Sequence, residues 1–100
     1  MTINIEKTND MTIAHLEGRL DTPASTEVAP YFKQLEDAAG GTVVLDCTEL
    51  VYISSSGLRL FLALRKASAA KGGKVIVRNI NDSIRQVFMM TGFLNLFEKE

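Results

Sequence analysis

Three consecutive serines followed by a glycine form the most unusual local string of the sequence, V-Y-I-S-S-S-G-L-R-L at residues 51–60. The string lies between an apolar strand-like run and a strongly patterned helix that begins near Ser56. The first amide N–H groups of a helix lack partners inside the helix, so a serine hydroxyl at that end can cap one of them. The same unpaired amides, together with the helix dipole, favour a phosphate. Ser56 is therefore either a structural helix cap or a phosphorylation site.

The residues after Ser56 offer a surface on which a protein partner could dock. Gly57 carries no side chain beside the hydroxyl, which would let a kinase or a partner approach the backbone closely. Leu58 and Leu62 form a second apolar stripe next to the core face of the helix, and Arg59 lies on the opposite, polar face. If the stripe remains open, it suits protein docking.

The first part of the chain predicts a hairpin and a helix. Short apolar alternation at residues 3–7 and 11–17, separated by the polar T-N-D, is typical of an opening β-hairpin. Thr22 is expected to cap a helix whose first residue is Pro23. Pro30 removes a backbone donor within that helix, so we expect either a kink or a helix that restarts there.

Strands and helices alternate in the rest of the chain. The apolar run at residues 42–50 predicts a central strand covered on both faces, with its polar end from Asp46 onward emerging at the sheet edge. A helix to about Ala70, a strand at residues 74–80 and a helix capped by Asn81 or Asp82 follow. The expected fold class is α/β: a single domain over residues 1–100 with a mostly parallel four-stranded sheet, an opening hairpin and three to four helices, in the order β-β-α-β-α-β-α.

Composition and charge favour one compact globular domain and disfavour a protein that binds nucleic acid or membranes. A chain of 100 residues with 46% hydrophobic and 23% charged residues fits one compact domain. The net charge of -1 and the absence of any run of Lys or Arg disfavour binding to nucleic acid. No stretch has the length of a membrane span or the form of a signal peptide, so we expect a cytoplasmic protein that does not bind membranes. One cysteine, Cys47, and one histidine, His15, form no cluster with zinc spacing, so no metal or cofactor is predicted.

Taken in order, these motifs resemble the STAS domains of bacterial anti-sigma factor antagonists. The string I-S-S-S-G-L looks like the D-S-S-G-L segment of that family, G-R-L-D at residues 18–21 looks like its G-x-L-D, V-V-L-D at residues 43–46 looks like its central strand, and residues 84–97 look like its last helix. The resemblance covers nearly the whole chain and implies that Ser56 is the phosphorylated serine, with Ser54 standing where the family usually carries Asp. The residues expected to form the environment of the phosphorylation site, or to bind the partner, are Asp21, Ser54, Ser55, Gly57, Leu58, Arg59 and Leu62.

The resemblance implies a protein-binding switch with no catalytic role of its own. In its unphosphorylated form the protein would bind an anti-sigma factor that is also a serine kinase, and so release a sigma factor. A PP2C-like phosphatase would reset the switch. An alternative is an accessory STAS subunit of a transporter or a larger signalling assembly that is never phosphorylated, a reading that Ser54 favours. A serine hydrolase using Ser56 is disfavoured, because the G-x-S-x-G motif is absent and the one histidine lies far away on another strand.

Overall fold

The computed structural model describes residues 1–93, 95 and 97–99, which form a sheet with helices between its strands. The elements are β1 (Thr2–Lys7), β2 (Met11–Leu20), α1 (Thr22–Asp37), β3 (Thr42–Ile53), α2 (Ser55–Ala70), β4 (Lys74–Arg78), α3 (Asp82–Met90) and β5 (Glu98–Lys99). The predicted fold class and element order are confirmed, and the two-residue β5 is an addition beside β4.

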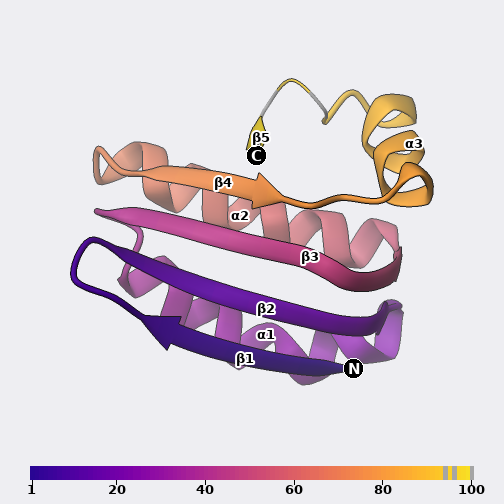
Figure 1. The fold of residues 1–100 in the computed structure, drawn as a ribbon, viewed down its shortest axis with the longest axis horizontal. Coiled ribbons are helices and arrows are strands. Elements are labelled where there is room, and N and C mark those ends of the chain that lie inside the picture. Colours follow the sequence, from indigo (N-terminus) through magenta and orange to yellow (C-terminus); the bar gives the residue numbers. More distant parts are fainter. Residues whose placement is uncertain (94, 96, 100) are drawn as a thin grey trace.

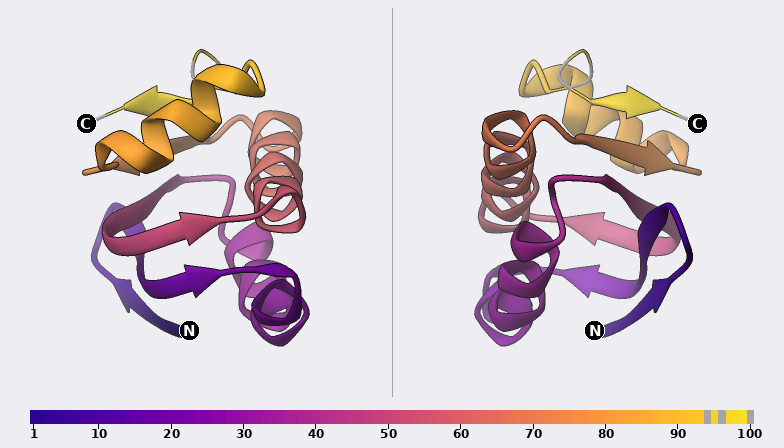
Figure 2. Two further views of the ribbon diagram at one scale, coloured as in Figure 1. Left: turned by 90° about the vertical axis from the view of Figure 1, so that its right-hand side faces the viewer. Right: turned by 90° about the vertical axis from the view of Figure 1, so that its left-hand side faces the viewer.

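The sheet has the strand order β1-β2-β3-β4-β5, in which β1 is antiparallel to β2 and the other pairs are parallel. Successive parallel strands are added in one direction, so right-handed crossovers place their connecting helices on the same face. Figures 1 and 2 show α1 and α2 side by side on one face of the sheet, α1 next to β2 and α2 next to β3 and β4, which leaves the opposite face free of these two helices. No described helix has both the length and the apolar composition needed to span a membrane.

Phe61 of α2 lies at the centre of the core between the helices and the sheet. Its ring stacks on Phe32 of α1 at 5.8 Å and meets the edges of Phe88 of α3 and Phe97 at 6.1 and 6.3 Å. Aromatic pairs at these separations add to the free energy gained by burying apolar area. The Phe61 side chain therefore joins three helices and fixes the position of α2.

A smaller apolar cluster lies on the other face of the sheet, where Ile13, Val44 and Ile76 from adjacent strands pack with Met11. Val43 and Leu45 on the helix side of β3 are fully buried, and so is Val44 on the opposite side. This confirms that the first half of β3 is covered on both faces.

The second half of β3 differs from the prediction. Asp46 does not emerge at the sheet edge, because the strand continues to Ile53 and Asp46 pairs with His15 on β2 and Arg78 on β4. The register between β2 and β3 shifts twice beyond this point, and each shift gives β3 one extra residue. Such bulges twist a strand and turn side chains outward, which explains how a polar stretch remains in a strand.

The start of α1 also differs by one residue. Asp21, not Thr22, is the N-cap, since its Oδ1 accepts a hydrogen bond of 3.0 Å from the amide of Ala24. The helix does not restart at Pro30 but continues to Asp37. Pro30 and Thr26, whose carbonyl loses its donor, are both exposed, so water can satisfy that carbonyl.

Asn81 is the N-cap of α3, one of the two predicted residues. Its Oδ1 accepts from the amide of Ile84 at 2.9 Å, while its Nδ2 donates to the carbonyl of Leu50 at 2.9 Å. One side chain thus begins α3 and attaches it to β3.

Candidate phosphorylation and partner-binding site

The segment between β3 and α2 assigns different roles to its serines. Ser54 is the N-cap of α2, and its Oγ accepts a hydrogen bond of 3.2 Å from the amide of Gly57. The expectation that Ser56 caps the helix is wrong, because α2 begins at Ser55 and Ser56 is its second residue. Any of the three serines has the chemistry of a cap, and only the backbone geometry selects Ser54.

Ser56 is half-buried in the first turn of α2, and its hydroxyl makes no hydrogen bond to any residue of the described chain. Ser55 beside it is exposed, whereas Ser54 is half-buried and engaged as the cap. The Ser56 hydroxyl is therefore at the surface and is not needed to begin the helix.

Gly57 has an internal function that differs from the expected one. It is buried, and a Cβ at this position would lie 2.8 Å from Cγ of Leu20 and 2.9 Å from Cγ1 of Ile53. Real Cβ atoms do not approach other atoms so closely in a packed core. The glycine thus lets α2 approach β2 and β3, and it does not open the backbone to a partner.

The apolar stripe of Leu58 and Leu62 is mostly closed. Leu58 is only 3% exposed and belongs to the main core, while Leu62 is half-buried. The sequence left open whether this stripe is exposed, and at Leu58 it is closed. Arg59 is exposed, as its place on the polar side of the helix predicted.

Asp21 lies on the loop beside Ser54, as expected. The amide of Ser54 donates to the carbonyl of Leu20 at 2.9 Å, which holds the β2–α1 and β3–α2 connections together. In this structure the carboxylate of Asp21 caps α1.

Sequence reasoning missed an exposed pair of residues at the end of β3. Val51 is the extra residue of a bulge and is 57% exposed, and Tyr52 next to it is 38% exposed. The guanidinium of Arg19 on β2 lies 4.4 Å from the centre of the Tyr52 ring, a cation–π contact. Strand alternation cannot reveal this surface, because the bulge breaks the alternation at Val51.

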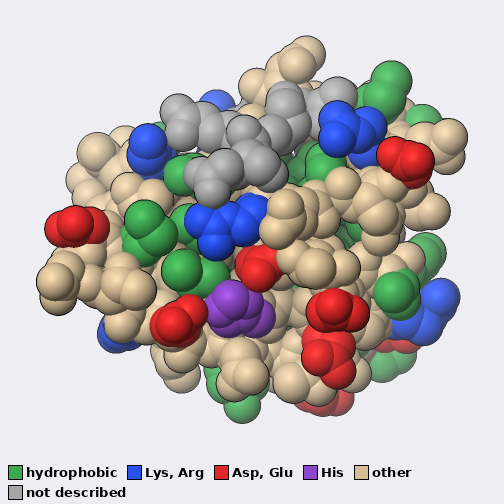
Figure 3. Space-filling view, in the orientation of Figure 1, with side chains coloured by type: hydrophobic (Ala, Val, Ile, Leu, Met, Phe, Trp, Pro, Cys, Tyr) green, Lys and Arg blue, Asp and Glu red, His purple; other side chains and the backbone are tan. Residues whose placement is uncertain are grey.

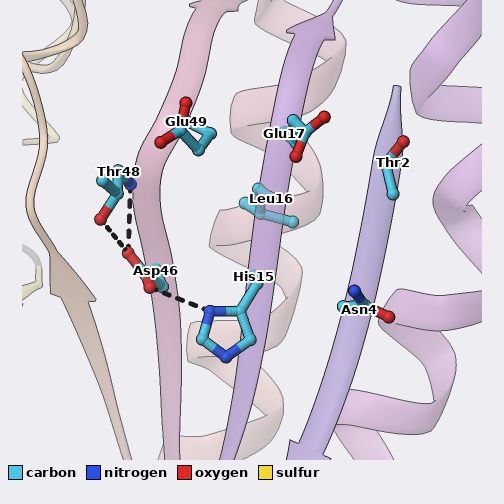
Figure 4. A pocket seen from close by; sticks show the side chains of 8 residues that line it. All are labelled: Thr2, Asn4, His15, Leu16, Glu17, Asp46, Thr48 and Glu49. Carbon is cyan, nitrogen blue, oxygen red and sulfur yellow. Dashed lines mark hydrogen bonds and ion pairs between the residues drawn. The ribbon is translucent and has the colours of Figure 1, made fainter.

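Sequence reasoning also missed a polar cluster on the sheet face opposite α1 and α2. His15 Nδ1 is 2.9 Å from Asp46 Oδ2 and His15 Nε2 is 3.1 Å from Glu6 Oε1, so the imidazole joins β3 to β1 across β2. Figure 4 shows His15 directed toward Asp46, whose other oxygen accepts from the amide and the hydroxyl of Thr48 at 3.1 and 2.6 Å. Asn79 Nδ2 then donates to Thr48 Oγ1 at 3.0 Å, which extends the chain of hydrogen bonds to the loop before α3.

The cluster borders a hollow of about 70 Å³ on this face, and Figure 3 shows acidic side chains around the histidine. The hollow is lined by Thr2, Asn4, His15, Leu16, Glu17, Asp46, Thr48 and Glu49. The pairing register that brings Asp46 opposite His15 was not readable from the sequence.

The cluster shifts the pKa values of two of its members. The hydrogen bond to Glu6 raises the pKa of His15 above its ordinary value of 6.5; burial opposes this effect, and the hydrogen bond and charge of Asp46 add to it. Burial favours a higher pKa for Asp46, but the two hydrogen bonds from Thr48 and the contact with His15 outweigh it and hold that pKa below 3.8. Both ring nitrogens of His15 are thus engaged with carboxylates, and neither serves Ser56 as a base.

Metal ligation finds no support in the part of the chain that the structure describes, where no three His, Cys, Asp or Glu side chains form a cation site. Cys47 is fully buried, and burial raises the pKa of its thiol to about 12. The thiol is therefore protonated and unreactive near neutral pH.

Comparisons with known proteins agree with the geometry. The family model described as STAS domain matches residues 2–100. BtrV of Bordetella bronchiseptica, which is named an anti-sigma factor antagonist, is 31% identical over 97% of this chain and 84% of its own length. The unphosphorylated form of SpoIIAA, an anti-sigma factor antagonist, superposes with a TM-score of 0.80 at 23% identity, over 99% of this chain and 88% of that one. A Thermotoga maritima protein named for the same role superposes with a TM-score of 0.87 at 14% identity, over 97% and 84% of the two chains.

Proposed function

Because the chain belongs to the STAS domain family, we propose that it is an anti-sigma factor antagonist that is switched off by phosphorylation of Ser56. The observation that carries the proposal is the Ser56 hydroxyl, which lies at the surface in the first turn of α2 and is free of the capping role that Ser54 fills. Exposure alone does not select Ser56, since Ser55 is more exposed. The resemblance to the D-S-S-G-L segment selects it.

In the proposed mechanism the unphosphorylated protein binds an anti-sigma factor in the cytoplasm and thereby releases a sigma factor. The docking surface surrounds Ser56 and includes the exposed pair Val51 and Tyr52, which lie just before the last residue of the preceding strand. A phosphate adds roughly -1.5 to -2 charges to a surface matched to a neutral hydroxyl. A loss of about 2.7 kcal/mol in binding free energy already reduces affinity a hundredfold. Phosphorylation therefore ends the binding, because the added negative charge is unmatched by the partner and would have to be desolvated in the interface.

The enzymes of the cycle would be the partners of this protein. The anti-sigma factor would itself be the serine kinase, and a PP2C-like phosphatase would restore the hydroxyl. This protein would be their substrate and would catalyse no step.

A second candidate function is an unphosphorylated STAS accessory subunit of a transporter or a signalling assembly. Ser54 favours it, because a neutral cap occupies the position where the family usually carries a carboxylate. Under this alternative the surface around Ser56 is a permanent contact.

Mass spectrometry after incubation with the candidate anti-sigma factor and Mg-ATP tests the proposal. We expect one main phosphate, located on Ser56, and no incorporation into the Ser56→Ala variant. A main phosphate on Ser54 or Ser55 would overturn the assignment of the site. Binding of the kinase with no phosphate on any of the three serines would favour the accessory subunit.

A further inference from the structure

We propose that Arg59 is the residue that pairs with the phosphate on Ser56, so that phosphorylation also withdraws the positive charge of Arg59 from the docking surface. This inference rests on the proposed function, since it concerns the regulation of the same serine.

The spacing on α2 brings the two side chains together. Ser56 and Arg59 are three residues apart in a helix that runs from Ser55 to Ala70. Residues at this spacing are neighbours on a helix surface, with Cβ atoms about 5–6 Å apart. Helical side chains also lean toward the N-terminus, so a long side chain at position 59 covers the turn that holds Ser56.

The guanidinium of Arg59 is available for a new partner. The side chain is exposed and makes no ion pair or hydrogen bond with the described residues. No residue of α2 is acidic, and its N-cap is the neutral Ser54. Asp21 on the adjacent loop is already engaged at the start of α1. A phosphate on Ser56 would therefore be the nearest anion along α2.

The chemistry of the pair favours arginine over other residues. A guanidinium presents a planar fork of N–H donors that can bond two phosphate oxygens at once. In the unphosphorylated protein the same fork faces outward, where it can meet an acidic group of the anti-sigma factor. Phosphorylation then changes the surface twice, by adding negative charge and by occupying the arginine.

The second ionisation of the phosphate provides a direct readout, because a paired guanidinium favours the dianion. Phosphoserine is incorporated at position 56 during translation, and the phosphate is titrated by phosphorus NMR. Without perturbation its second pKa is about 6. In Arg59→Gln we expect this pKa to rise by about 0.3 pH units relative to the parent protein.

Lys66→Gln is the matched control, since it removes the same charge from the same helix at an exposed position about 15 Å along the axis from Ser56. We expect it to move the phosphate pKa by less than half as much. If Arg59→Gln moves the pKa no more than Lys66→Gln, the pairing is overturned. Because the phosphate is built in, this result is independent of whether a kinase modifies Ser56, which tests the proposed function separately.

Discussion

At the scale of single residues, the hydroxyls of Ser54 and Ser56 have separable roles. The Ser54 hydroxyl accepts a hydrogen bond from the amide of Gly57, whereas the Ser56 hydroxyl makes no hydrogen bond with the described residues. Under the proposed function, stability and switching would therefore depend on different serines. This separation makes Ser56 replaceable without cost to the fold.

Ser54→Ala should lower the free energy of unfolding by about 1 kcal/mol, because it removes a helix cap. Ser56→Ala should change the free energy of unfolding by less than about 0.5 kcal/mol, because Ser56 is neither a helix cap nor part of the packed core. Urea unfolding monitored by circular dichroism measures both. Ser54→Asp, which keeps a capping oxygen, is the control and should remain near wild type. A larger loss from Ser56→Ala than from Ser54→Ala would contradict the assignment of the cap.

Gly57→Ala should destabilise the protein even though alanine favours a helix. The new Cβ would lie 2.8 Å from Leu20 and 2.9 Å from Ile53, two buried side chains that have little room to move. Overpacking of this kind costs about 1–3 kcal/mol, against a gain in helix propensity of about 1 kcal/mol. Gly41→Ala is the control, since nothing lies within 4 Å of its added Cβ. Unfolding free energies showing Gly57→Ala at or above wild type would refute the packing role.

At the scale of elements, His15 joins β1, β2 and β3 through two carboxylates. Protonated His15 can donate to both Glu6 and Asp46, whereas the neutral ring has one N–H. Because its folded pKa is raised, His15 contributes stability fully below pH 6.5, and this contribution is lost as pH rises through the folded value. Asp46 acts in the opposite sense: its contribution is full above pH 3.8 and is lost as pH falls through its lowered folded value. Both contributions are therefore present between pH 3.8 and 6.5.

The NMR titration of His15 should have a midpoint above 6.5. Glu6→Gln and Asp46→Asn should each lower this midpoint, since the hydrogen bond to Glu6 is the largest cause of the raised pKa and Asp46 adds to it. Glu17→Gln, which lines the same hollow without a hydrogen bond to His15, should have the smallest effect. A midpoint at or below 6.5 in the wild-type protein would show that the cluster does not hold the charge of His15.

The elements themselves were largely predictable, because apolar periodicity and turn residues mark their ends. The end of β3 was not predictable, since its bulges interrupt the alternation of apolar and polar residues beyond Asp46. The bulges keep Thr48, Glu49 and Val51 within the strand. The caps at Asp21 and Ser54 were also missed by one or two residues. Neighbouring residues there have equal capping chemistry, and only the backbone conformation distinguishes them.

At the scale of the whole molecule, the order of short motifs predicted more than any motif alone. Each of G-R-L-D, V-V-L-D and I-S-S-S-G-L is degenerate, but their sequence and spacing implied the STAS fold. Long-range pairing was beyond this reasoning. The contact of His15 with Asp46 joins residues 31 positions apart, and it depends on the register of two parallel strands.

The whole molecule also explains how a single phosphate could act as a switch. The loops before α1 and α2 are joined at Leu20 and Ser54, and Arg19 and Tyr52 are in contact one residue before the ends of the strands that lead into them. Ser56 thus lies beside a surface built from several elements, held in place by the core around Phe61. Under the proposed function, a charge at this site would alter docking without requiring a change of fold.

Calorimetric titration of the candidate anti-sigma factor with wild type, Ser56→Ala and Ser56→Asp tests the central claim most directly. Ser56→Ala adds no charge and should bind with near wild-type affinity, whereas Ser56→Asp should bind at least about tenfold more weakly because its charge opposes docking. Urea unfolding of the same samples shows whether each variant is folded. If folded Ser56→Asp binds the anti-sigma factor as tightly as wild type, Ser56 is not the switch.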